Sequence, residues 1–301
     1  MKFWELIKAI FYGILEGITE WLPVSSTGHL ILLDEFMGLN VAPELGETFR
    51  AEYWNMFEVV IQLGAILAVI FLFFRKLNPF APSKTAEEKR GTWVLWVKVL
   101  IASVPAALIG VVGDKILEKL SGKDLDGWFY NFWVVAATLI LYGILFIVVE
   151  RYYRNKESRV TSVDDISYRQ AILIGCFQTL SIIPGTSRSG STILGARTIG
   201  VSRPAAAEFS FFMGIPAMLG ASLLKGLDFF QYVSAESVQV PAFAWIILAL
   251  ASIVAFVVSM LVIRFLMDFV KRHSFIPFGW YRIGLGIVLL AYGIIRYVIL
   301  A

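Results

Sequence analysis

The chain has 301 residues, of which 58% are hydrophobic and only 16% charged, and its mean hydropathy is +0.75. These values exclude an ordinary soluble globular protein and indicate a helical protein that crosses a membrane several times. The net charge of +3 is small, and we expect no nucleic-acid partner. A single cysteine, Cys176, excludes an intramolecular disulfide and a cysteine-based metal cage.

The first apolar stretch, residues 4–33, is interrupted near its middle by a polar tract and Pro23. Its Glu16 and Glu20 argue against a cleavable signal, so we expect the stretch to remain in the mature protein. A later stretch, residues 169–200, is broken in the same way. Membrane segments of this kind are tolerated where the broken backbone lines a protein cavity. The two stretches are therefore predicted to form re-entrant helical hairpins.

Six further apolar runs reach the roughly 20 residues that a helix needs to cross a hydrocarbon core about 30 Å thick. We therefore predict an all-α polytopic membrane protein, with six transmembrane helices plus two re-entrant helical hairpins in a single integral membrane domain over residues 1–301. The predicted spans are residues 57–74, 93–113, 130–149, 205–224, 241–266 and 276–299.

The two polar tracts, residues 25–29 and 187–191, lie 162 residues apart, and several neighbouring residues match at the same offset. Each half of the chain then holds one hairpin and three spans. Because three crossings are an odd number, the halves, about 1–150 and 165–301, are expected to form an inverted repeat. The matches are Gly13 with Gly175, Glu16 with Gln178 and Gly38 with Gly200, followed by Glu58 to Gly64 with Glu208 to Gly214 at an offset of 150.

Basic residues concentrate in three segments, 75–98, 151–169 and 264–282, which fall on one side of the six-span arrangement. The positive-inside rule places this side in the cytoplasm. Both termini and the first hairpin then face outward, whereas the second hairpin enters from the cytoplasm. We expect the two hairpin tips to meet within the membrane.

Glu16 and Glu20 are one helical turn apart and share a helix face inside an apolar stretch. Ionisable groups at membrane depth cost about 2.5–3.5 kcal/mol each on insertion scales, which favours a functional role. The alternative is that they lie at the interface and extend toward water. Two carboxylates this close either share a proton or bind a cation, and a hard divalent ion, Mg²⁺ or Ca²⁺, suits their oxygens.

The first polar tract supplies hydroxyls from Ser25, Ser26 and Thr27 and the imidazole of His29. A serine at such a break usually caps the helix that follows. Capping explains neither three hydroxyls nor one of only two histidines in the chain. Histidine can serve as general acid or base near neutral pH, whereas His273 lies in a basic segment and is expected at a solvated surface.

The second tract places Arg188 among hydroxyls and backbone N–H groups at the start of a helix, as in a phosphate or oxyanion cradle. Alternatively, Arg188 is a structural ion-pair partner for Glu16 or Glu20. Outside the tracts we expect an ion pair between Arg203 and Glu208. The hydroxyls of the second tract belong to Thr186, Ser187, Ser189 and Ser191, and Glu58 and Gln62 are candidates for residues that surround the site.

Together these motifs make the chain resemble the bacterial undecaprenyl pyrophosphate phosphatases, also called bacitracin-resistance proteins, over nearly its whole length. The resemblance implies hydrolysis of a long-chain polyprenyl diphosphate to the monophosphate and inorganic phosphate. This reaction recycles the lipid carrier of peptidoglycan synthesis, and thereby supports cell wall biogenesis, cell shape and bacitracin resistance. The matching segments are residues 15–29 (LEGITEWLPVSSTGH), 57–64 (FEVVIQLG), 184–190 (PGTSRSG) and 208–211 (EFSF).

The resemblance also implies a divalent cation, Mg²⁺ or Ca²⁺, and an active site that faces the outer side of the bacterial plasma membrane. Ser26 is the expected nucleophile, activated by His29 or Glu20, with a phospho-enzyme or an oriented water both open. Arg188 would stabilise the transferring phosphoryl group. The expected site comprises Glu16, Glu20, Ser26, His29 and Arg188 for catalysis, Glu16 and Glu20 for the metal, and Ser25, Thr27, Thr186, Ser187 and Ser189 for substrate binding.

Inverted repeats with broken helices also occur in secondary transporters, so the alternative function is a transporter or flippase for a lipid phosphate or another anion. A different lipid-phosphatase superfamily also has a Ser-Gly-His tract, but it needs a second histidine after its arginine motif. Here no histidine follows Arg188 until His273. The expected partners are the polyprenyl diphosphate substrate and membrane lipids, and a homodimer is a possible assembly.

Overall fold

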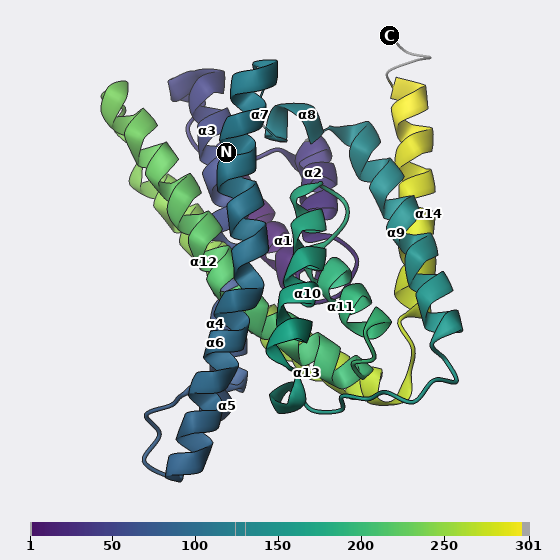
Figure 1. The fold of residues 1–301 in the computed structure, drawn as a ribbon. Helices are drawn as coiled ribbons and strands as arrows, with labels where there is room; N and C mark the ends of the chain where they lie inside the picture. The colour runs from purple at the N-terminus through teal and green to yellow at the C-terminus, as the bar shows by residue number, and fades with distance from the viewer. Residues whose placement is uncertain (1, 124, 130, 297–301) are drawn as a thin grey trace.

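A computed structural model describes residues 2–123, 125–129 and 131–296 (Figure 1). In these residues six helical units are long and apolar enough to cross a membrane. This confirms the predicted all-α class with six spans, although residues 130 and 297–299 of the predicted spans lie outside the described residues. The units are Pro43–Leu72, Ala86–Ser121, Phe132–Tyr152 (α9), Arg203–Ala235 (α12), Ala242–Arg272 (α13) and Ile276–Ile294 (α14).

Two of these units are composite. The first joins η1 (Pro43–Leu45), α3 (Gly46–Val60) and α4 (Gln62–Leu72), and the second joins α6 (Ala86–Leu108), a π-helical turn η2 (Ile109–Gly113) and α7 (Asp114–Ser121). The first unit starts well before residue 57, where the sequence predicted it. Its early turns bury Phe49 and Tyr53 but expose charged side chains on the opposite face, and this mixture lowers the local hydropathy.

The two predicted hairpins correspond to pairs of short helices on either side of a break. The first pair is α1 (Lys2–Thr19) and α2 (Ser26–Met37); the second is α10 (Tyr168–Gln178), extended by η4 (Thr179–Ile182), and α11 (Arg188–Thr198). Three of the four, α2, α10 and α11, have 11 or 12 residues and are about 17 Å long, too short to cross the bilayer. Their length is compatible with re-entry, whereas α1 is longer, with 18 residues. The remaining elements are α5 (Phe74–Leu77), α8 (Leu125–Phe129) and η3 (Val163–Asp165).

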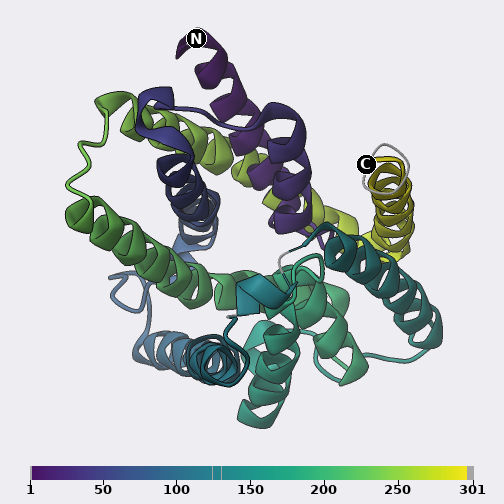
Figure 2. The same cartoon turned by 90° about the horizontal axis from the view of Figure 1, so that it is seen from above.

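The short helices of each half pack against a long helix of the other half, α1 against α13 and α10 against α6. Glycines allow both close approaches: a Cβ at Gly13 would lie 2.5 Å from the carbonyl oxygen of Ala251, and a Cβ at Gly175 would collide with the carbonyl oxygen of Ala102. The last helices of the two halves, α9 and α14, lie side by side (Figures 1 and 2). This reciprocal pairing is compatible with the inverted repeat.

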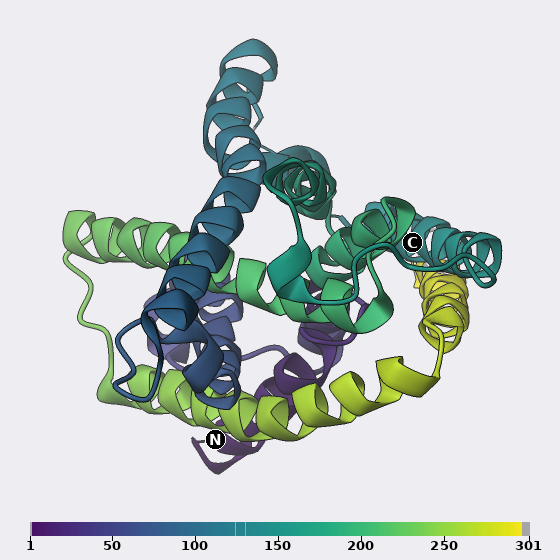
Figure 3. The ribbon, with the colours of Figure 1, turned by 60° about the horizontal axis from the view of Figure 1, so that its bottom comes forward.

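The loops of the three basic segments gather at one end of the molecule, the lower end in Figure 1, whereas α7 and α8 lie at the opposite end. Figure 3 shows α13 running along one side of the molecule from the end of α12 to the start of α14. At the basic end, the Arg203–Glu208 ion pair expected from the sequence does not form. Arg203 Nη2 instead lies 2.6 Å from Glu150 Oε2, and Lys76 Nζ lies 2.9 Å from Glu208 Oε1. Arg203 and Glu208 are close in sequence, but each lies nearer to an oppositely charged residue on another helix.

Candidate functional site

Both hairpin tips begin with a serine in the left-handed backbone region, Ser25 with φ 75° and Ser187 with φ 71°. Each hydroxyl accepts a hydrogen bond from the N–H three residues on, that of Gly28 at 3.3 Å and that of Gly190 at 3.1 Å. Capping, weighed from the sequence, therefore applies to these two serines and leaves Ser26 for another contact. Such strained residues cost on the order of 1–3 kcal/mol and cluster at functional sites.

The carboxylate of Glu20 joins the two tips. Ser26 Oγ donates to Glu20 Oε2 at 2.7 Å, and Arg188 Nη2 and Nε donate to Glu20 Oε1 at 2.9 and 3.3 Å. The three side chains are largely buried, so their charge-assisted hydrogen bonds are shielded from water. The structure thus brings Ser26 and Arg188 together, as the repeat predicted, and the expected alternative of a Glu20–Arg188 ion pair is part of the same cluster.

Helix α12 fixes the other side of the Arg188 guanidinium. Arg188 Nη1 donates to the carbonyl oxygen of Ser210 at 2.7 Å, and the Ser210 hydroxyl lies 2.6 Å from that of Thr192. A Cβ at Gly214 would lie 2.9 Å from Arg188 Nη2, so a larger residue there would require the guanidinium to shift from its hydrogen-bonded position. Sequence reasoning did not assign roles to Ser210 and Gly214, although the repeat match over residues 208–214 marked their segment.

The cluster lines a cavity of about 460 Å³. Glu20, Ser26 and Arg188 contribute to its wall, and the wall continues between α6 and α12 toward the end of the molecule opposite the basic loops. A polar cluster at one end and a largely apolar wall, with Ser103 and Lys225 as its polar members, at the other are suited to a ligand with an anionic head and an apolar tail. The other predicted residues in the lining are Ser25, Thr27, Gln62 and Ser187.

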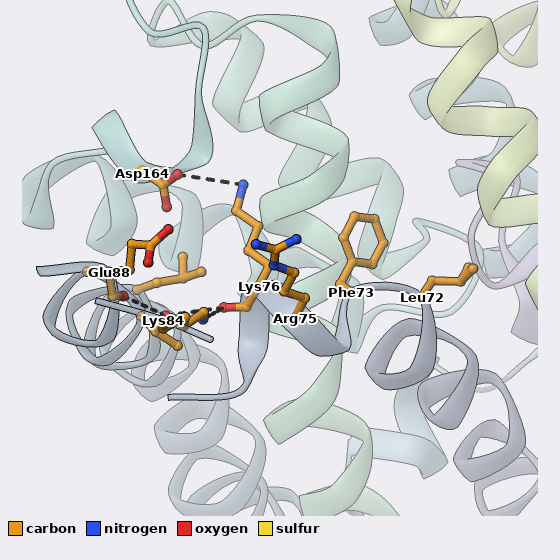
Figure 4. A pocket seen from close by; sticks show the side chains of 10 residues that line it. Leu72, Phe73, Arg75, Lys76, Lys84, Glu88 and Asp164 are labelled. Atoms are coloured by element: carbon orange, nitrogen blue, oxygen red, sulfur yellow. Dashed lines mark hydrogen bonds and ion pairs between the residues drawn. The ribbon is translucent and has the colours of Figure 1, made fainter. Parts of the chain in front are cut away.

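A second cavity of about 460 Å³ lies at the basic end, between α5, α6 and η3, which holds Asp164 (Figure 4). Three of its charged groups already have partners: Lys84 Nζ donates to Thr92 Oγ1 at 2.6 Å, and Lys76 Nζ lies 3.7 Å from Asp164 Oδ2. None of its lining residues belongs to the two polar tracts. The cavity between the hairpin tips is therefore the candidate site.

Glu16 is completely buried, and neither carboxylate oxygen has a hydrogen-bond partner among the described residues. The charged side chains of Glu20, Glu58 and Arg188 lie close enough to interact electrostatically with the Glu16 carboxyl group. Its repeat counterpart, Gln178, lines the cavity, and the Oε1 atom of Gln178 has no partner in the described part of the chain either. Glu16 itself does not line the cavity, and its oxygens leave room for a partner that is a water or an ion.

The structure holds no group of three or more His, Cys, Asp or Glu side chains arranged for a metal among its described residues. A cation would thus rely on one or two carboxylates, with hydroxyls, waters or phosphate oxygens as further ligands. That donor set fits Mg²⁺, which is often bound by one or two carboxylates plus substrate phosphates. The arrangement is therefore compatible with a cation held through Glu16 and Glu20.

His29 is turned away from the cavity wall. Its Nδ1 lies 2.7 Å from the carbonyl oxygen of Ser25, and its Nε2 lies 2.7 Å from the hydroxyl of Tyr281, so both ring nitrogens are engaged. Thr186 donates to the carbonyl oxygens of Leu180 and Ile183 within its own tip. These two predicted site residues are placed to shape the tips.

Ser189 also connects the hairpins, since its hydroxyl donates to the carbonyl oxygen of Glu20 at 3.1 Å. The bond crosses from the second tip to the residue that carries the central carboxylate. Ser189 is completely buried and is absent from the cavity wall. Its contact therefore fixes the backbone of Glu20.

Arg282 of α14 was missed by sequence reasoning. It is completely buried and clasps both broken tips: Nη1 donates to the carbonyl oxygen of Pro23 at 3.1 Å, and Nη2 to those of Gly185 and Thr186 at 2.6 and 2.9 Å. The guanidinium carbon lies 5.4 Å from the ring centre of Tyr142. These carbonyls are left over where the helices break, and Arg282 satisfies them inside the protein.

Replacing Arg282 with methionine should destabilise the protein by about 3 kcal/mol or more, because three buried carbonyls lose their donors. The stability of Arg282→Lys should lie between those of the wild type and of Arg282→Met, because an ammonium group cannot reproduce the planar array of guanidinium donors. Arg264→Met is the matched control, because Arg264 is an exposed arginine of α13. Thermal unfolding of the detergent-solubilised variants measures the difference. Equal melting temperatures for Arg282→Met and Arg264→Met would show that the clasp contributes nothing.

Known proteins place the chain among relatives of similar length. A family model described as "Bacitracin resistance protein BacA" matches residues 9–288. A protein from Streptococcus mutans serotype c, named undecaprenyl-diphosphatase, is 53% identical over 98% of this chain and 99% of its own length. Proteins of the same name from Enterococcus faecalis and Lactococcus lactis subsp. lactis are each 51% identical, over 97% of this chain and 99% and 98% of their own lengths. The chain therefore belongs to the bacitracin resistance protein BacA family.

Proposed function

We propose that this protein is an undecaprenyl-diphosphatase of the plasma membrane, which converts a polyprenyl diphosphate to the monophosphate and inorganic phosphate and so recycles the carrier of cell-wall synthesis. The observation that carries the proposal is the Glu20 carboxylate, which holds Ser26 and Arg188 in one cavity. The names of the relatives support it. The same activity accounts for resistance to bacitracin. Phosphate release by the protein purified in detergent, where transport is impossible, is the direct test.

Ser26 is the proposed nucleophile and Glu20 its base. As the Ser26 hydroxyl attacks the terminal phosphorus, its proton passes to Glu20 Oε2, the oxygen that it already contacts at 2.7 Å. The bond from the terminal phosphorus to the bridging oxygen breaks, and prenyl monophosphate leaves. Water then hydrolyses the phosphoserine and releases phosphate. Glu20 is favoured over His29 as the base because His29 contacts Ser25 and Tyr281 through its two ring nitrogens.

Arg188 has the proposed role of an electrostatic stabiliser. Its Nε and Nη2 bind Glu20, and a phosphoryl group that enters the cavity offers a competing anion. A shift of Arg188 toward the phosphoryl oxygens would free Glu20 to accept the proton and would stabilise the charge of the transition state. Thr27 and Ser187, which line the cavity, are proposed to hydrogen-bond the diphosphate.

A divalent cation, Mg²⁺ or Ca²⁺, is proposed to bind through Glu16 with Glu20, and when bound it would neutralise charge on the diphosphate. The partnerless oxygens of buried Glu16 support this assignment. The active site is proposed to open to the outer side, because the cavity extends away from the basic loops. A transporter or flippase is not favoured, since the relatives are named as a diphosphatase.

Ser26→Ala should abolish phosphate release, and Glu20→Gln should lower turnover by about 10²–10⁴-fold, the usual contribution of a general base. Ser25→Ala is the matched control, because loss of a cap costs roughly 1 kcal/mol of stability and removes no reacting group. Steady-state turnover and melting temperature are measured together. Near-normal turnover in Ser26→Ala would eliminate the nucleophile assignment.

Glu16→Gln should raise the Mg²⁺ or Ca²⁺ concentration for half-maximal activity by more than about tenfold, since the neutral amide binds hard cations weakly. Independently of activity, Mg²⁺ or Ca²⁺ should raise the melting temperature of the wild type and leave that of Glu16→Gln unchanged. Glu47→Gln, at an exposed glutamate, is the control. A wild type that stays fully active after exhaustive chelation contradicts the metal assignment.

A cysteine at Lys225, which lines the cavity and follows the last residue of the predicted span 205–224, should react with a membrane-impermeant maleimide added outside intact cells. The background carries Cys176→Ser, so that the new thiol is unique. Arg90→Cys, in a basic segment, should react only after the cells are permeabilised. The reverse labelling pattern would place the cavity mouth on the cytoplasmic side.

A further inference from the structure

The candidate site cavity extends well beyond the catalytic cluster, along a seam between α6 and α12. In this part of the wall the side chains of both helices are unusually small. One α12 residue of the wall, Leu224, is half exposed on the outside of the protein, and so is Val111 of η2. The cavity therefore reaches from Ser26 to an exposed, largely apolar surface of the protein, with Lys225 beside Leu224 in its wall. The small residues of the seam are Ala106, Ala107, Gly110, Ala217, Gly220 and Ala221.

Both helices are irregular where they form this wall. Pro105 lies inside α6 and is followed by the π-helical turn Ile109–Gly113, and Pro216 lies inside α12. An internal proline removes a backbone hydrogen bond and bends its helix, and π-helical turns are frequent at functional sites. The distortions coincide with the cavity wall, which indicates that they shape the seam.

The glycines of the seam differ from the packing glycines elsewhere in the fold. A Cβ at Gly13 would press against α13, whereas a Cβ at Gly110 or Gly220 would meet no heavy atom within 4 Å among the described residues. Close helix packing therefore does not require glycine at these two positions. Their effect is to keep the space between α6 and α12 open.

We propose that the seam is a binding groove for the isoprenoid chain, and that its small residues set the cross-section that the chain must fit. This inference rests on the proposed function. With the diphosphate between Ser26 and Arg188, the first isoprene units would lie against α6 and α12 and the rest of the chain would leave past Leu224 into the bilayer. Methyl-branched isoprene units need a wider groove than a straight acyl chain, and the alanines and glycines provide it.

Substrates that share the diphosphate and differ in the chain test the groove. The wild type should hydrolyse farnesyl diphosphate with a kcat/KM at least about tenfold above that for isopentenyl diphosphate, because only the longer chain buries several CH₂ groups in the seam. Gly110→Leu and Gly220→Leu should each lower this ratio at least about tenfold. Gly284→Leu is the matched control and should leave it unchanged, since Gly284 also faces open space but lies on α14, outside the cavity.

The possible outcomes distinguish a wrong assignment of the groove from a wrong assignment of the function. Failure of the wild type to release phosphate from either substrate would overturn the proposed function. Activity with an equal kcat/KM for both substrates, or a ratio that the leucine variants leave unchanged, would overturn the groove alone.

If the leucine variants fail to fold, a labelling experiment on the wild type still tests the groove. A farnesyl diphosphate analogue with a diazirine at the end of its chain should label wild-type residues 103–111 and 216–225. Labelling confined to other segments would refute the groove.

Discussion

The fold depends on the hydrogen bonds and the ion pair that stabilise the buried carboxylate of Glu20. Glu20 lies in an apolar environment, where an unpaired carboxylate is strongly unfavourable. It obtains one hydrogen bond from Ser26 of its own hairpin and two from Arg188 of the other. The two bonds from Arg188 form only when the two tips meet, so the electrostatic requirement selects one arrangement of the halves. Packing alone would not, since helices in a bilayer have little hydrophobic reason to prefer one partner over another.

The rest of the structure allows this meeting. Glycines at residues 13 and 175 bring each short helix against a long helix of the opposite half, which holds the tips at a common depth. Arg282 then binds carbonyls of both breaks. A guanidinium suits this task because its donors point in several fixed directions at once. The tips are thus tied together twice, by their side chains around Glu20 and by their backbones around Arg282.

Hydropathy sufficed to predict the six spans and the two broken segments, because length and apolar content are local properties. It failed for residues 43–56, where one helix face is buried and the other is charged. The polar tracts marked Glu20, Ser26 and Arg188, since such residues are costly in a membrane. Arg282 was not predicted as a site residue because it was counted with the basic residues of 264–282. The number of charges in a segment does not show which of them are buried in the protein. The Arg188 contact with Ser210 uses a backbone carbonyl, which has no sequence signature.

The Arg188–Glu20 ion pair has a consequence for selectivity in a bilayer crowded with other phosphates. The Arg188 guanidinium is already neutralised by Glu20, so an arriving anion must compete with an internal carboxylate. A phosphodiester headgroup carries one negative charge spread over two oxygens and gains little from the exchange. A terminal phosphoryl group carries more charge and has three free oxygens, so it can displace the carboxylate from the planar guanidinium group. The ion pair therefore favours an anion that binds the guanidinium more strongly than the Glu20 carboxylate does.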